Sequence, residues 1–102
     1  MPKQAVFIVN TGADGSAEAF SPPKLSGPVK SIEYITDGRI PYDAGASFTF
    51  TGETSKAEVL AVESVDGRAK WDASGVLANE RVKVVIANGG KGKSGSFVVT
   101  TE

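Results

Sequence analysis

Residues 87–94 read Ala-Asn-Gly-Gly-Lys-Gly-Lys-Ser, which satisfies the loose pattern of a phosphate-binding loop. In such a loop, backbone amides and the N-terminus of a following helix hold the phosphates. Here Ser94 is followed by Gly-Ser-Phe-Val-Val-Thr-Thr, which is typical of a strand. We therefore expect a glycine-rich hairpin loop rather than a nucleotide site. Lys91 and Lys93 would then be solvated side chains or contacts to an acidic patch on a protein partner.

Other residue types that carry catalysis are missing or scattered. The chain has no His and no Cys, which removes the commonest general base, the thiolate nucleophile and zinc–thiolate sites. A nucleophilic Ser would have only Lys as its base, and the 12 acidic residues form no calcium-binding series. We therefore predict that the protein is not an enzyme and binds no metal and no cofactor.

Length and charge limit the remaining classes of protein. A chain of 102 residues leaves room for one domain, and 40% hydrophobic with 23% charged residues is ordinary globular usage. The net charge of −1 gives no general attraction to nucleic acid or to an anionic membrane. The N-terminal apolar run is too short for a signal peptide. We expect a protein made in a cytoplasm and kept there, or carried in a particle assembled there.

The spacing of apolar residues predicts strands. They recur mainly at every second position, and Gly, Pro, Ser and Thr interrupt them. Phe48 and Phe50 share one face of such a segment, so both are predicted core residues. Residues 74–80 would make one helical turn at most. Six segments fit the strand pattern: Gln4–Val9, Val29–Thr36, Ser47–Thr51, Ala57–Val65, Arg81–Ala87 and Ser96–Thr101.

The last two of these segments are expected to pair as a hairpin at the centre of the fold. Val82, Val84 and Ile86 share a face, and Phe97 and Val99 would meet them across the hairpin. The pattern favours an all-β fold of six to seven mostly antiparallel strands. The architecture would be an immunoglobulin-like β-sandwich or a small barrel, with an extended N-terminal arm.

The N-terminal part of the chain is interpreted as a strand followed by a Pro-rich arm. Thr11–Pro28 contains Gly and Pro breakers, which are typical of a long loop or an extended arm. We therefore divide the single domain into an arm, residues 1–28, and a β-sandwich core, residues 29–102. Gln4–Val9 either docks on a partner or forms the first strand of the domain's own sheet, and both alternatives remain open.

If the arm docks on a partner, its apolar side chains are the expected contacts. Val6, Phe7, Ile8 and Phe20 would supply apolar surface. Prolines would reduce the conformational entropy lost on docking. The proline pair Pro22 and Pro23 lies near the middle of the arm.

Two segments of the C-terminal half resemble small structural proteins of tailed bacteriophages. Residues 45–54 read Gly-Ala-Ser-Phe-Thr-Phe-Thr-Gly-Glu-Thr, and residues 79–97 run from Asn-Glu-Arg-Val-Lys-Val-Val-Ile to Gly-Ser-Phe. The resemblance implies a capsid decoration or cement protein on the outer surface of the phage head, assembled in the bacterial cytoplasm. Its partners would be the major capsid protein and neighbouring copies of itself, so a homo-oligomer on the capsid is expected. No catalytic residues come with this family.

Two other functions remain open. A phage tail or head-completion protein would use the same β-domain in a ring. An immunoglobulin-like adhesion or carbohydrate-binding module would stack sugars on exposed aromatic side chains of one face. The aromatic residues for such a platform would be Tyr34, Tyr42 and Trp71.

Overall fold

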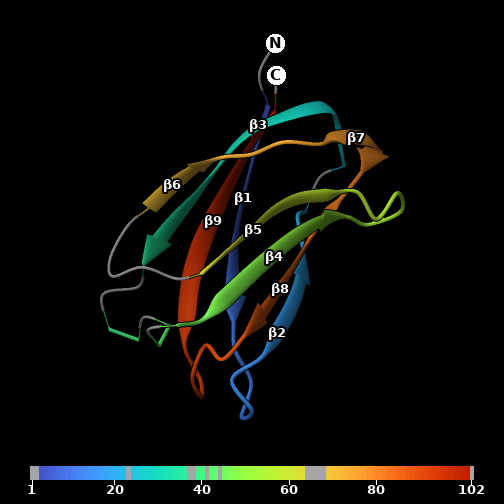
Figure 1. Cartoon of the computed structure of the whole chain (residues 1–102). Helices are drawn as coiled ribbons and strands as arrows, with labels where there is room; N and C mark the ends of the chain where they lie inside the picture. Colours follow the sequence, from blue (N-terminus) through green and yellow to red (C-terminus); the bar gives the residue numbers. More distant parts are fainter. Residues whose placement is uncertain are drawn as a thin grey trace.

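The computed structural model describes residues 3–22, 24–36, 39–40, 42–43, 45–63 and 69–101. These residues form nine strands and no helix (Figure 1). The strands are β1 (Lys3–Asn10), β2 (Ala17–Phe20), β3 (Leu25–Thr36), β4 (Ser47–Gly52), β5 (Glu58–Glu63), β6 (Ala69–Asp72), β7 (Val76–Glu80), β8 (Val82–Ala87) and β9 (Ser94–Thr101).

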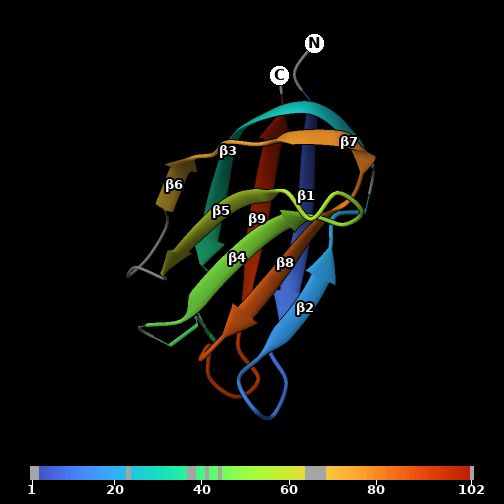
Figure 2. The ribbon, with the colours of Figure 1, turned by 45° about the vertical axis from the view of Figure 1, so that its right-hand side comes forward.

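The strands form two sheets that pack face to face (Figure 2). The five-stranded sheet has the order β1-β9-β3-β6, and β7 pairs with the first part of β3. The four-stranded sheet has the order β2-β8-β4-β5, and all these pairs are antiparallel. The predicted all-β sandwich is confirmed. The described residues form nine strands instead of six or seven, because short strands occupy segments interpreted as arm or loop.

The N-terminal part of the chain belongs to the sandwich. β1 pairs with β9 over its whole length, from Lys3 opposite Thr101 to Asn10 opposite Ser94. β2 pairs with β8, and the expected boundary at residue 28 falls inside β3. The structure therefore has strands where an extended arm was expected. Of the two alternatives for the N-terminal segment, it supports a strand of the protein's own sheet.

β8 and β9 lie in different sheets, so the expected hairpin is wrong. Residues 88–93 carry the chain from one sheet to the other. Alternation of apolar residues predicts which side of a strand is buried, but it does not distinguish a hairpin from a crossing between sheets. The apolar side chains of both strands are buried in the shared core: Val82, Val84, Ile86, Phe97 and Val99.

Phe97 lies at the centre of an aromatic core. Its ring centroid is 5.2 Å from that of Phe48 and 5.3 Å from that of Phe50, both in the opposite sheet. The prediction that these two phenylalanines are core residues is confirmed. The ring of Tyr34 packs beside Phe97 at 5.6 Å. A Cβ atom on Gly95 would lie 2.6 Å from the Tyr34 ring, so this packing requires glycine.

Candidate functional site

β1 presents apolar side chains on both of its faces. Its inner face is buried in the core, whereas Val6 is 60% exposed and Ile8 is 67% exposed. Strand pairing sets Val6 beside Val98, and it sets Ile8 and Ile35 on either side of Ser96. Val98 and Ile35 are half-buried. We call Val6, Ile8, Ile35 and Val98 the outer apolar patch.

The sequence interpretation named only half of this patch. Val98 and Ile35 alternate with Phe97 and Tyr34, so their place on the outer faces of their strands could be predicted. Their position beside β1 depends on the strand order β1-β9-β3, which alternation does not specify.

β1 is also the most open edge of the sandwich. β9 is the only described strand that pairs with it. Gln4–Ile8 contains no charged residue and no proline. The other described edge strands either have four or five residues (β2, β6 and β7) or begin and end with Glu (β5). Open edges pair readily with other strands, and short length or charge normally prevents this.

Phe7 is not available to a partner. Its side chain is 7% exposed, and its ring centroid lies 6.1 Å from that of Phe97. Its assignment as a contact residue is wrong, because alternation along β1 turns it to the face opposite Val6 and Ile8.

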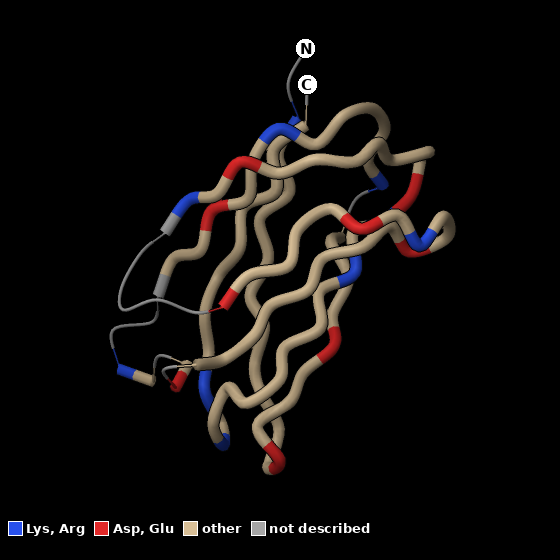
Figure 3. The backbone as a smooth tube through the Cα atoms, in the orientation of Figure 1, with Lys and Arg blue, Asp and Glu red and all other residues tan. Residues whose placement is uncertain are grey.

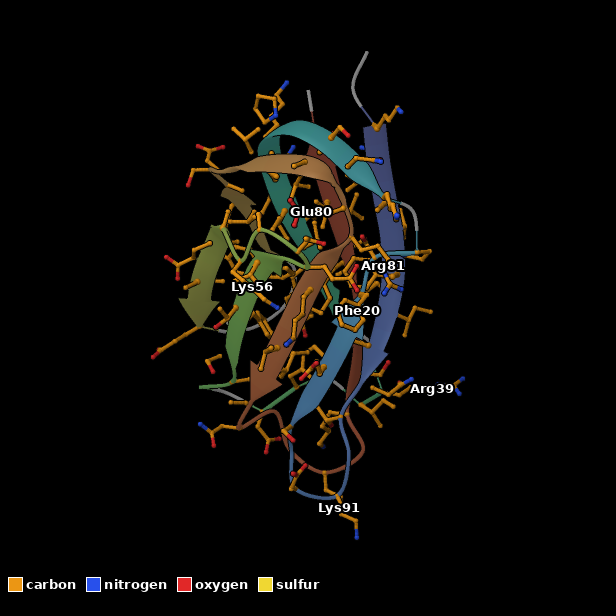
Figure 4. All side chains as sticks on the ribbon, turned by 90° about the vertical axis from the view of Figure 1, so that its right-hand side faces the viewer. Phe20, Arg39, Lys56, Glu80, Arg81 and Lys91 are labelled. Carbon is orange, nitrogen blue, oxygen red and sulfur yellow. The ribbon has the colours of Figure 1, made fainter. Side chains whose placement is uncertain are left out.

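Phe20 lies in the other sheet, on β2, and is covered by its own chain. The guanidinium carbon of Arg81 lies 4.6 Å from the centroid of the Phe20 ring (Figure 4). Arg81 Nε donates to Glu53 Oε1 at 2.9 Å, and the hydrogen bonds from this arginine lower the pKa of Glu53. Phe20 therefore does not join the outer apolar patch. Pro22 is exposed beyond β2, and Pro23 lies outside the described residues.

Lys91 and Lys93 lie in the loop between β8 and β9. Lys91 is exposed at the tip of this loop (Figure 4), and Lys93 is half-buried.

More generally, charged residues lie mainly near turns and strand ends, and the strands contain long uncharged stretches (Figure 3). The described candidate residues therefore belong to four separate regions: the outer apolar patch, the core in the case of Phe7, the β2 edge and this loop.

The loop that matches the phosphate-binding pattern uses its backbone groups within the protein. Gly89 N donates to Gly15 O at 2.8 Å, and Lys93 N donates to Thr11 Oγ1 at 2.8 Å. The Asp43 carboxylate lies next to Gly90, where a Cβ atom would approach it to 2.5 Å. Bonded amides and a neighbouring carboxylate disfavour phosphate at this loop, which is followed by a strand rather than a helix.

Glu80 is a buried carboxylate with a structural role. Its Oε1 accepts hydrogen bonds from the backbone N–H groups of Thr54 and Ser55, and its Oε2 accepts one from Ala78, all at 2.9 Å. The backbone hydrogen bonds, that from Ser55 first, lower the pKa of Glu80 to about 2. The side chain therefore stays charged at neutral pH and ties the end of β7 to the turn between β4 and β5.

The surface also has an open depression of about 280 Å³ at one end of β4 and β5. Glu63 is the one ionisable side chain among the described residues that line it, so these residues offer no acid–base pair. The described ranges contain no cluster of three or more metal-ligating side chains. Among the residues that the structure describes, there is no helix long and apolar enough to cross a membrane.

The aromatic side chains do not form a stacking platform. Tyr34 and Tyr42 are buried, and burial raises the pKa of Tyr42, whose hydroxyl donates to Val9 O. Trp71 is half-buried, with its ring 6.4 Å from that of Phe48. All eight aromatic residues lie within the described ranges, and none is classed as exposed. A carbohydrate-binding module that stacks sugars on an open aromatic face would need a different surface.

Comparison with known proteins shows the fold alone. No family model matches the chain, and no curated protein is similar in sequence. The crystal structure of FlhE superimposes with a TM-score of 0.57 over 100% of this chain and 96% of that chain, at 16% identity. Two mutants of family 29 carbohydrate-binding modules give TM-scores of 0.48 and 0.47 at 8% and 7% identity. These two alignments include 94% of this chain and 69% and 64% of the other chains. Similarity at this level gives no information about function.

Proposed function

We propose that this protein is a non-catalytic structural protein that binds another protein through the outer apolar patch. The exposure of Val6 and Ile8, 60% and 67%, is the observation that carries the proposal. Clustered apolar side chains on a surface favour protein–protein contact, because association removes them from water. A β-sandwich supports them rigidly, so little conformational entropy is lost when a partner binds.

We further propose that this partner is the outer surface of a phage capsid. This step is supported by the sequence resemblance of residues 45–54 and 79–97 to small phage structural proteins. In the fold, these segments include β4, β8 and part of β9. A patch of four aliphatic side chains suits a decoration protein, because weak contacts repeated by capsid symmetry stabilise the shell in sum.

Sedimentation with capsids that lack the protein tests this function. The purified chain is mixed with the particles, the particles are pelleted, and bound copies per capsid are counted by densitometry. We expect on the order of hundreds of copies, as symmetry of the shell requires. About a dozen copies or fewer would indicate a tail or head-completion protein, and no bound copies would contradict the proposal.

A pair of variants tests the role of the patch. Ile8→Asp places a charge in it, whereas Val76→Asp places the same charge on β7, where Val76 is 62% exposed. We expect Ile8→Asp to weaken particle binding at least about tenfold, since the contact loses the burial of one aliphatic side chain. Val76→Asp should bind like the wild-type chain. Equal binding by both variants would show that the patch is not the contact.

A further inference from the structure

We propose that β1 of one molecule pairs antiparallel with β1 of a second copy, so that two five-stranded sheets join across a two-fold axis. The regularity, the lack of charge beyond Lys3 and the exposed apolar side chains of β1 favour this pairing. The use of the joined surface for binding rests on the proposed function. In this dimer the two outer apolar patches become neighbours on one continuous face.

The free part of the β1 edge is regular. The pairing of β1 with β9 has no register shift, whereas the pairings of β3 with β7 and with β9 each contain one. The segment that pairs is Gln4–Ile8, which follows Lys3 and contains no charged residue. This segment lies away from the turn that leads to β2 (Figure 2). A regular, uncharged edge of this kind pairs readily with a further strand.

The side chains of β1 are compatible with a copy of the same strand, which favours a second copy of this chain as the partner. Lys3, the first residue of β1, is the one charged residue of this strand. Antiparallel pairing around Val6 would place Val6 opposite its equivalent and Gln4 opposite Ile8 of the other copy. The two Lys3 side chains then lie at opposite ends of the interface, so no like charges face each other. The two exposed Val6 side chains meet instead, on the same side of the joined sheet as Gln4 and Ile8.

Charge substitution at Val6 tests the pairing. Sedimentation velocity over a range of concentrations should show the wild-type chain shifting towards twice its 10.5 kDa mass. Val6→Lys and Val6→Glu should each remain monomeric, because like charges would lie directly opposite across the two-fold axis. An equimolar mixture of the two variants should recover the dimer. Val76→Lys, at a position of similar exposure on β7, is the matched control and should dimerise like the wild type.

Two results would overturn this inference. One is a wild-type chain that stays monomeric throughout the concentration range. The other is a Val6→Lys variant that dimerises as the wild type does. Either result would show that β1 does not pair with its equivalent.

Disulfide formation tests the same geometry without adding charge. The chain has no Cys, so a single Val6→Cys substitution introduces the one thiol. Residues opposite each other in an antiparallel pair have Cα atoms about 4.5–5.5 Å apart, which a disulfide can span. Oxidation should convert Val6→Cys to a covalent dimer and leave Val76→Cys largely monomeric. Failure of Val6→Cys to cross-link, or equal cross-linking of both variants, would overturn the pairing.

Particle binding separates this inference from the proposed function. A covalent Val6→Cys dimer that binds no capsid would contradict the proposed function and leave the β1 pairing intact. A monomeric Val6→Lys variant that reaches the wild-type number of copies per capsid would overturn the role of the joined patch. The capsid-binding function would then stand without the dimer.

Discussion

Glu80 is a single side chain that holds two parts of the fold together. A buried carboxylate normally favours its neutral form, because burial removes hydration from the charge. Here the backbone N–H groups of Ser55, Ala78 and Thr54 replace that hydration and lower the pKa of Glu80 to about 2. A Cβ atom on Gly52 would lie 2.5 Å from Glu80 Oε1, so glycine is required beside the carboxylate.

Glu80→Gln should destabilise the protein by about 3 kcal/mol at neutral pH, the free energy that corresponds to this lowering of the pKa. The folded-state pKa of Glu80 lies below its ordinary value of 4.5, so its charge stabilises the fold above that pH. The stabilisation is lost as pH falls from about 4.5 towards 2. Urea unfolding should therefore give a stability difference between wild type and variant that is largest at neutral pH and shrinks towards pH 2. A difference that does not change with pH would contradict this assignment.

The hydroxyl group of Thr11 fixes the loop between β8 and β9. It donates to Gly90 O at 2.5 Å and accepts from Lys93 N at 2.8 Å. Thr11→Val keeps the shape of the side chain and removes both hydrogen bonds, so we expect a loss of about 1–3 kcal/mol in unfolding free energy. Thr11→Ser retains the hydroxyl and should lose clearly less. Equal losses in thermal unfolding would indicate that the methyl group, rather than the hydroxyl, matters.

At the scale of the strands, alternation predicted which side chains are buried. Phe48 and Phe50 alternate with hydroxyl residues, and both are fully buried in β4. In β1 the same period buries Phe7 and exposes Val6 and Ile8. Such local patterns can be read from sequence because successive side chains of a strand point to opposite faces.

Strand partners could not be predicted in the same way. β2 has only four residues and two apolar alanines, so nothing in Ala17–Phe20 separated it from a loop. The crossing at residues 88–93 could equally have been a hairpin, because both arrangements bury the same faces. Val98 and Ile35, which make up half of the outer apolar patch, lie beside β1 only because of the strand order. That order is set by contacts between residues distant in sequence.

Deletion of residues 1–10 should abolish cooperative folding. The deletion removes β1 and with it the buried side chains of Ala5, Phe7 and Val9. Phe7→Ala alone should cost about 3–5 kcal/mol, a large part of the roughly 5–15 kcal/mol that stabilises a small domain. Val6→Ala, on the exposed face of the same strand, should change stability by less than about 0.5 kcal/mol. A sharp thermal transition after the deletion, followed by circular dichroism, would show that the N-terminal strand is dispensable.

On the scale of the whole molecule, the first and last strands of the chain pair with each other at one edge of the five-stranded sheet. β1 and β9 lie side by side, with Lys3, the first residue of β1, opposite Thr101, the last residue of β9 (Figure 1). Gln4 and Thr100 are opposite each other in this pair, and Gln4 Nε2 donates to Thr100 Oγ1 at 3.4 Å. The two residues are 96 positions apart in the chain. Their pairing therefore closes a loop that contains almost the entire sequence.

A disulfide between Gln4→Cys and Thr100→Cys should stabilise the fold, because it closes a loop nearly as long as the chain. Chain-entropy arguments give about 4.7 kcal/mol for a loop of roughly this length, reduced by any strain in the bond. The double variant, oxidised, should unfold at higher urea concentration than the same protein after reduction, which serves as its own control. The gain comes from restricting the unfolded chain, so it requires no new contact in the folded state. A disulfide that forms only in urea, or that lowers the urea midpoint, would show that β1 and β9 do not meet in this register.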